Sequence, residues 1–141
     1  MIYTIDTNVL IDALRQPAEL DRLKAFLSWA LPSTVLSSVV AAELAAGARS
    51  EQARDALDDL FLAPFERRQR IIAPSAATWR RVGTLLPRAT GVGTASRQND
   101  LLLAAQTREH GWTLITRDAD FRLLRESISG LKVVAPFPTR P

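Results

Sequence analysis

Four acidic residues stand where a carboxylate could do chemistry: Asp6, Glu43, Asp100 and Asp118. Asp6 and Asp118 each follow a short β-prone run, and in an open parallel sheet the carboxyl ends of the strands are where ligands are held. Glu43 and Asp100 fall in the opening turns of two predicted helices, so all four carboxylates can point into one crevice. Packed carboxylates repel one another strongly unless cations or protons lie between them. This arrangement predicts a binding site for a divalent cation.

The three aspartates also have a simpler explanation, because an Asp directly ahead of a helix can act as its N-cap. Glu43 does not share this explanation. It lies in the apolar run 39–46, and a capping box would place the acid three residues after Ser38, where the sequence has Ala41. An unpaired carboxylate facing that interior would be strongly unfavourable. The remaining ordinary explanation is a solvent-facing Glu on a mostly buried helix.

The composition restricts the kind of metal site. The 141 residues, 47% hydrophobic and 23% charged, suit a single globular domain with its own core. There is no cysteine and only one histidine, His110, near a predicted helix end where it interacts with the helix dipole. Zinc hydrolases usually need several His ligands. Any metal must therefore be held by oxygen atoms, which suits Mg²⁺ or Mn²⁺.

The charge balance gives weaker information about partners. The chain has 18 Lys+Arg against 15 Asp+Glu, a net charge of +3, and only Lys24 and Lys132 are lysines. Arginine pairs well with phosphate, but a biased genome composition would produce the same excess. No apolar run approaches the ~20 residues of a membrane span, and Asp6 and Asp12 interrupt any secretory signal. We therefore expect a cytoplasmic protein with no membrane partner.

The apolar periodicity predicts strands that alternate with helices. The predicted strands cover residues 2–5, 34–37, 70–73, 112–116 and 131–135. The predicted helices follow Asp6, cover 17–31 and 39–46, run from Ser50 to just before Pro64, start again at Pro74, and cover 99–109. This alternation predicts an α/β fold with a parallel sheet covered on both faces. A single domain over residues 1–135 should precede an extended, proline-rich tail over 136–141.

The segments DTNVLID, SVVAAEL, NDLLLAA and TRDADF, in this order, resemble the PIN-domain family. More narrowly, they are similar to the VapC-type toxins of bacterial toxin–antitoxin pairs. The resemblance covers essentially the whole chain. It implies a five-stranded parallel sheet in a three-layer α/β/α sandwich, and an Mg²⁺- or Mn²⁺-dependent endoribonuclease activity.

The resemblance also implies roles for individual residues. The acidic quartet of the family falls on Asp6, Glu43, Asp100 and Asp118, the catalytic and metal-binding positions. The supporting polar positions fall on Thr116, Asn8, Asn99 and Asp120. By analogy, three aspartates would ligate the main ion, and Glu43 would act through water or at a second ion. Asp120 remains an alternative to Asp118 as the fourth acid.

Substrate and partner contacts are further expectations. Three arginines beside the acidic segments could contact RNA phosphates: Arg97, Arg117 and Arg122. A second group of arginines, at positions 67, 68, 70, 80 and 81, fits an ordinary solvent-exposed face. The loop 91–96 could shape the entry to the site. The resemblance implies a cognate antitoxin and a homodimer. An antitoxin segment could lie in an apolar groove between the predicted helices 17–31 and 39–46.

Other functions fit less well. A haloacid-dehalogenase-like phosphatase would need a second Asp where the sequence has Asn8, and a receiver domain would need a late functional Lys after a strand, whereas Lys132 lies within one. The main alternative is a non-catalytic PIN-like module that binds RNA or protein.

Overall fold

The computed structural model describes residues 1–88 and 98–141 in full and the backbone of residues 94–97. In this part of the chain, five parallel strands form one sheet in the order β3-β2-β1-β4-β5. The strands are β1 (Tyr3–Ile5), β2 (Thr34–Ser37), β3 (Ile71–Ile72), β4 (Thr113–Ile115) and β5 (Lys132–Val134). This confirms the predicted five-stranded parallel sheet.

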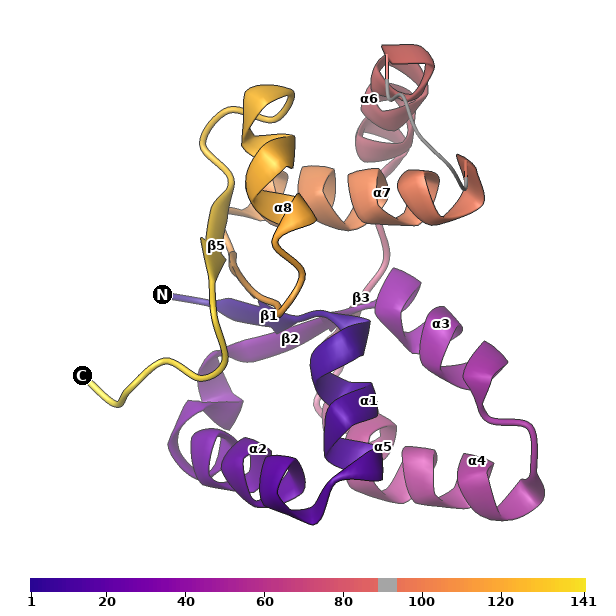
Figure 1. The fold of residues 1–141 in the computed structure, drawn as a ribbon, viewed down its shortest axis with the longest axis vertical. Helices are drawn as coiled ribbons and strands as arrows, with labels where there is room; N and C mark the ends of the chain where they lie inside the picture. The colour runs from indigo at the N-terminus through magenta and orange to yellow at the C-terminus, as the bar shows by residue number, and fades with distance from the viewer. Residues whose placement is uncertain (89–93) are drawn as a thin grey trace.

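Helices cover both faces of the sheet (Figure 1). The helices are α1 (Thr7–Arg15), α2 (Pro17–Ala30), α3 (Ser38–Gly47), α4 (Glu51–Leu57), α5 (Ala63–Glu66), α6 (Ala76–Leu85), α7 (Thr94–His110) and α8 (Asp120–Leu123). In the view of Figure 1, α1, α2, α4 and α5 lie below the strands, and α6, α7 and α8 lie above them. The arrangement is the predicted three-layer α/β/α sandwich.

The central strands are the most buried part of the chain. All residues of β1 and β4 are buried, and Ile5, Leu114 and Ile115 have no exposed surface. A parallel strand covered on both faces needs apolar side chains on both sides, which explains why these segments lack polar alternation. The register places Tyr3 opposite Thr34 on one side and Thr113 on the other.

The strand order reverses between β1 and β4. The chain adds β2 and β3 on one side of β1, and then crosses to add β4 and β5 on the other side. In doubly wound sheets, ligands bind outside the carboxyl ends of the strands at such a reversal. Residues that directly follow β1 and β4 therefore meet at the position where a ligand is expected.

Two helix boundaries differ from the sequence prediction. The helical run that follows Ser50 does not stop before Pro64, because a π-helical turn (Asp58–Leu62) leads into α5, with Pro64 in its first turn. Proline is tolerated there because the first turn of a helix leaves its N–H groups unpaired in any case. The run keeps Phe61 and Phe65 buried in the core. Similarly, α7 begins at Thr94, earlier than the predicted start at residue 99.

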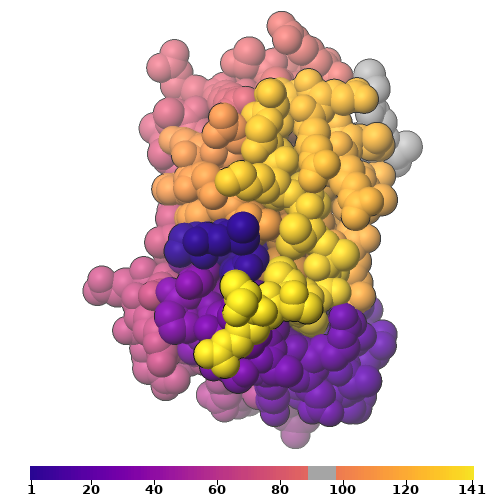
Figure 2. Space-filling view, turned by 90° about the vertical axis from the view of Figure 1, so that its left-hand side faces the viewer, coloured from indigo at the N-terminus to yellow at the C-terminus, as the bar shows by residue number. Residues whose placement is uncertain are grey.

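The C-terminal tail folds back onto α2. Figure 2 shows it lying across the surface of α2, close to the N-terminal residues. The rings of Phe137 and Phe26 stack with centroids 5.4 Å apart, and the Arg22 guanidinium lies 5.4 Å from the centroid of the Phe137 ring. Arg22 also donates a 3.0 Å hydrogen bond to the Pro136 carbonyl. The tail forms no helix or strand of its own, but it is fixed to the domain by these contacts.

Among the described residues, no helix has the length and apolarity of a membrane span.

Candidate metal-binding site

Asp6 lies at the reversal point of the sheet. Its backbone N–H donates a 3.0 Å hydrogen bond to the Ile115 carbonyl, which fixes Asp6 to the end of β4. Its carboxylate accepts hydrogen bonds from the Thr7 backbone N–H (2.8 Å), the Thr116 hydroxyl (2.7 Å) and the Asn8 side-chain amide (3.2 Å). Asp6 is thus the N-cap of α1 as well as a buried acid, 6% exposed, between two strand ends.

The surroundings of Asp6 disfavour its charged form. Burial raises the pKa of the Asp6 carboxyl from its ordinary value of 3.8 to about 6. The hydrogen bonds from Thr116 and the Thr7 N–H act in the opposite direction, and the negative charges of Glu43 and Asp118 raise the pKa further. Three of the four predicted acids therefore lie in one electrostatic neighbourhood.

Thr116 connects Asp6 to the loop that carries Asp118. Its hydroxyl donates to Asp6 and accepts from the Asn8 amide (3.2 Å) and from the Asp118 backbone N–H (3.0 Å). The Asn8 side-chain oxygen accepts a 3.3 Å hydrogen bond from the Arg117 N–H. Asn8 and Thr116, both predicted as supporting residues, thus hold the β4–α8 loop against the start of α1.

Glu43 reaches the site from α3. Its carboxylate accepts a 3.0 Å hydrogen bond from the Thr7 hydroxyl, and its side chain is half-buried. Glu43 is therefore neither unpaired nor fully solvent-facing, so the ordinary explanation that remained for it does not hold. Thr7 was not among the predicted site residues, although a hydroxyl residue directly after Asp6 was the available signal.

The structure distinguishes Asp118 from Asp120. Asp118 is half-buried, and its charge acts on Asp6, whereas Asp120 is exposed at the start of α8. The Asp120 backbone N–H donates a 2.9 Å hydrogen bond to the Asp118 carboxylate, so the turn orients Asp118. Of the two acids, Asp118 has the position suited to act together with Asp6.

Asp100 lies on α7, which packs against α3. Its side chain is half-buried. Its neighbour Asn99 lines a cavity of about 240 Å³ together with Ser38, Val39 and Ala42 of α3. The turn of α7 that carries Asn99 and Asp100 therefore faces the helix that carries Glu43.

A buried glutamine fixes the position of α7. The Gln106 side chain accepts a 2.5 Å hydrogen bond from the Ser37 hydroxyl and donates a 3.0 Å hydrogen bond to the Ile72 carbonyl. Gln106 has no exposed surface, and its bond to Ser37 is buried in the core, where a hydrogen bond is stronger than in water. Gln106 was not among the predicted site residues, although it is a polar side chain directly after the apolar run 101–105.

The described side chains include no group of three or more His, Cys, Asp or Glu residues close enough to hold a metal ion by themselves. The donor set nevertheless fits a hard divalent cation in kind, because carboxylate oxygens are the ligands that Mg²⁺ and Mn²⁺ prefer. Asp6 also has a physical reason to accept a cation: its buried charge is opposed by burial and by two nearby acids. A cation would offset both effects.

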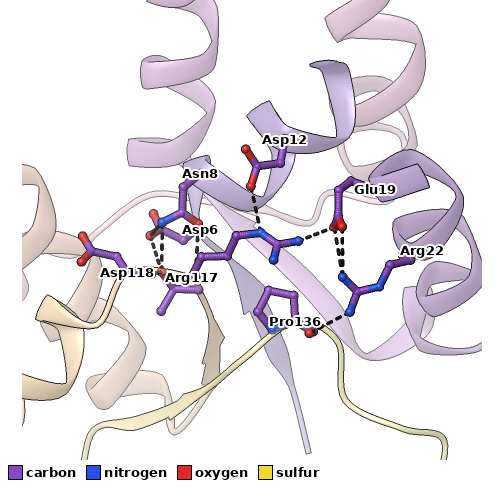
Figure 3. Close-up of polar contacts among 9 residues, drawn as sticks. Asp6, Asn8, Asp12, Glu19, Arg22, Arg117, Asp118 and Pro136 are labelled. Carbon is purple, nitrogen blue, oxygen red and sulfur yellow. Dashed lines mark hydrogen bonds and ion pairs between the residues drawn. The ribbon is translucent and has the colours of Figure 1, made fainter. Parts of the chain in front are cut away.

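The basic residues near the site differ in their contacts. Arg117 forms ion pairs with Asp12 and Glu19 (Figure 3). Arg122 is exposed and, with Asp118, lines a hollow of about 410 Å³. The side chain of Arg97 and the loop over residues 91–96 lie outside the residues that the structure describes in full.

Within the second group of arginines, Arg70 has a structural role. Its guanidinium donates to the carbonyls of Leu31 (3.0 Å) and Pro32, next to the start of β2. The other four arginines of this group, at positions 67, 68, 80 and 81, are exposed.

An apolar groove lies beside the acidic residues, but not where the sequence placed it. It has a volume of about 310 Å³ and is lined by residues of α1, α3 and α4, among them Leu14, Leu44 and Leu57, with Glu43 also in its wall. The predicted contribution of the helix 17–31 is wrong. The leucines of α2 pack inward on the core instead, with Leu23 buried.

Comparison with known proteins agrees with this architecture. The family model of the PIN domain matches residues 3–126. One chain of the VapBC2 structure from Rickettsia felis, solved with a DNA fragment from the promoter, is 27% identical in sequence to this chain. The match has a TM-score of 0.70 and covers 96% of this chain and 98% of that chain. No curated protein matches the sequence.

Two further solved structures share the fold. They are the DNA-bound VapBC complex from Salmonella typhimurium (20% identity, TM-score 0.68, 96% of this chain and 98% of that chain) and FitAcB from Neisseria gonorrhoeae (23% identity, TM-score 0.65, 94% and 96%).

Proposed function

This chain belongs to the PIN-domain family, and from that premise we propose that it is a divalent-metal-dependent endoribonuclease. The observation that carries the proposal is the position of Asp6. It is buried at the reversal point of the sheet, held by hydrogen bonds from Thr116, Thr7 and Asn8, and it lies within electrostatic reach of Glu43 and Asp118. Nearby acids destabilise a buried carboxylate by repulsion and add no stability to the fold. Their presence around Asp6 therefore favours a role in holding a cation.

The proposed metal-binding roles come from the family resemblance, and the contacts support those of Asp6, Glu43 and Asp118. Asp6, Asp100 and Asp118 would hold Mg²⁺ or Mn²⁺, with Glu43 acting through water or at a second ion. A bound divalent cation supplies polarisation of the phosphoryl oxygen and activation of water. Thr116 and Asn8 fix the orientation of the Asp6 carboxylate, and Thr7 fixes that of Glu43. Asn99 would act as a supporting polar residue beside Asp100. Arg122 would contact an RNA phosphate at the edge of the site.

We further propose that the protein is the toxin of a toxin–antitoxin pair. The groove between α1, α3 and α4 suits the apolar face of an antitoxin segment, because Leu14 remains 41% exposed beside it. An occupant of this groove would lie next to Glu43. The similarity to VapBC2 supports this assignment, as that structure is itself a two-protein complex. Co-expression with the protein encoded alongside should yield a stoichiometric complex, which Leu14→Glu should weaken.

As a nuclease of cellular RNA, the protein should act in the cytoplasm, where its RNA substrate is present. It should also form a homodimer, which sedimentation would measure directly.

The test of the nuclease proposal is cleavage of total cellular RNA by the purified chain with Mg²⁺, Mn²⁺ or EDTA, followed by mapping of the new ends. Cleavage should require a divalent cation and should be lost in Asp6→Asn. It should persist in Asp59→Asn, which changes an exposed acid of the π-helical turn. RNA binding by the parent without any cleavage would instead support the alternative, a non-catalytic PIN-like binding module.

A further inference from the structure

Arg117 lies in the loop between β4 and α8, directly before Asp118. Its Nε atom lies 2.8 Å from the Asp12 carboxylate, and its guanidinium also bonds to the Glu19 carboxylate. Its backbone N–H donates to the Asn8 side chain at 3.3 Å. Both ends of the residue are therefore attached to other elements. Figure 3 shows the side chain extending away from Asp118 towards α1 and α2.

The two carboxylates come from different helices. Asp12 lies in α1 and Glu19 in the first turn of α2, on either side of the connection at Gln16. A guanidinium presents several N–H donors in a rigid plane, so one Arg can join two carboxylates in a fixed geometry that a Lys cannot reproduce. Arg117 thus links the loop that carries Asp118 to both helices at once.

Glu19 extends this network to the C-terminal tail. It also accepts hydrogen bonds from Arg22 at 3.1 and 3.2 Å, and Arg22 donates to the Pro136 carbonyl. Positive and negative groups therefore alternate from Asp12 through Arg117 and Glu19 to Arg22. Figure 3 shows this series running from α1 to the tail.

These contacts argue against a role for Arg117 in RNA binding. Asp12, Arg117, Glu19 and Arg22 together are neutral, the sum of two positive and two negative groups, so the charge of Arg117 is already balanced. A phosphate at Arg117 would meet two carboxylates already bound to the guanidinium, and those acids would repel it. Arg122 has no such pairing among the described contacts, and it is exposed where it lines the hollow of about 410 Å³ next to Asp118.

We propose that Arg117 is a positioning residue that fixes the Asp118 loop against α1 and α2, with Glu19 as its key partner. The inference rests on the proposed nuclease function only for its effect on the reaction; the effect on the loop is independent of it. A single exposed ion pair contributes little stability. However, small displacements of a group that acts in catalysis can lower the rate by orders of magnitude. The expected loss is therefore in turnover and loop order, with overall stability largely kept.

The decisive variant is Glu19→Gln, because the two roles of Arg117 predict opposite results. If Arg117 bound phosphate, removing its carboxylate partner would free the guanidinium and lower KM. If Arg117 positions the loop, Glu19→Gln should lower kcat with KM unchanged, as should Arg117→Gln, by about tenfold. Arg117→Lys should recover only part of the loss. Asp21→Asn, an exposed acid on α2, is the matched control for the change in charge.

Hydrogen exchange provides a readout that needs no RNA cleavage. Backbone amides of residues 116–120 should exchange faster in Arg117→Gln and Glu19→Gln than in the parent and in Asp21→Asn. If the parent does not cleave RNA, the nuclease proposal fails while this measurement still tests the positioning role. Unchanged exchange in both variants, or tighter RNA binding by Glu19→Gln, would overturn the inference.

Discussion

The Thr116 hydroxyl donates a 2.7 Å hydrogen bond to the Asp6 carboxylate and so joins two residues 110 positions apart in the chain. The bond spans the ends of β1 and β4, the two strands between which the order of the sheet reverses. The same hydroxyl accepts hydrogen bonds from Asn8 and from the Asp118 N–H. Its full set of partners makes Thr116 the polar centre of the site.

Replacement of Thr116 by Val should destabilise the fold. The substitution keeps the shape of the side chain but removes a donor to a buried carboxylate, which should lower the free energy of unfolding by about 1–3 kcal/mol. It should also raise the pKa of Asp6 further, because the hydrogen bond from Thr116 lowers that pKa. Urea denaturation at pH 7 and a carboxyl NMR titration would measure the two effects.

Thr113→Val is the matched control, since the buried hydroxyl of Thr113, on the strand β4 that directly precedes Thr116, has no hydrogen-bond partner among the described residues. Its loss should be neutral or stabilising. Equal destabilisation by the two substitutions would contradict the role given to Thr116.

The stability of the metal-free protein should depend on the ionisation of Asp6. Because the pKa of Asp6 is raised from 3.8 to about 6 in the folded state, the folded chain binds more protons than the unfolded chain between these values. The contribution of Asp6 to stability is therefore present at low pH, falls as the pH rises from about 4 to 6, and stays constant above that range. A shift of this size corresponds to about 3 kcal/mol.

Asp6→Asn removes this dependence while keeping a good N-cap. The variant should gain stability relative to the parent between pH 4 and pH 7 when both are measured with EDTA by chemical denaturation. A difference in unfolding free energy that stays constant over this range would argue against a protonatable Asp6.

The sequence could predict the parts of the site that follow from local order. A polar residue after a buried apolar run predicts a strand end, which located Asp6 and Asp118, whereas Thr116 was assigned only through the family resemblance. An acid within the apolar run 39–46 marked Glu43 as unusual. Each of these signals consists of residues that are close together in the sequence. Each could therefore be interpreted without knowledge of the fold.

The partners of these residues could not be predicted in the same way. The Arg117–Glu19 contact joins residues 98 positions apart and depends on how α2 packs beside the β4–α8 loop. The apolar groove lies between α1, α3 and α4, and the leucines of α2 pack on the core instead. The helical spacing of these leucines does not by itself show which surface they contact. The π-helical turn before Pro64 likewise depends on the burial of Phe61 and Phe65.

Asp118 and Asp120 should differ in their effect on metal binding. A ligand that binds only the folded state raises its stability, by about 2.7 kcal/mol at a hundredfold excess over Kd. Mn²⁺ should therefore raise the melting temperature of the parent and of Asp120→Asn, and this increase should be lost or strongly reduced in Asp118→Asn. If Asp120→Asn reduced the Mn²⁺-induced increase in melting temperature more than Asp118→Asn does, Asp120 and not Asp118 would be the metal ligand. Differential scanning fluorimetry over a range of Mn²⁺ concentrations would measure the effect.

The tail contacts should contribute to stability. Phe137→Ala removes the stacking on Phe26 and the contact with the Arg22 guanidinium, which should lower the free energy of unfolding by about 1–3 kcal/mol. Thr139→Ala, at an exposed position of the same tail, should have almost no effect. Equilibrium denaturation of the two variants provides the comparison, and equal stabilities would show that the tail does not contribute.

The central claim is that acids from separate segments of the chain meet at one site and hold a divalent cation there, Asp6, Asp100 and Asp118 directly and Glu43 through water or at a second ion. Anomalous diffraction from crystals of this chain soaked in Mn²⁺ tests it most directly. We predict a manganese peak at the reversal point of the sheet, within coordinating distance of the Asp6 carboxylate and bordered by Asp100, Asp118 and Glu43. No peak at this position in fully soaked crystals, or a peak only at exposed acids elsewhere, would contradict the claim.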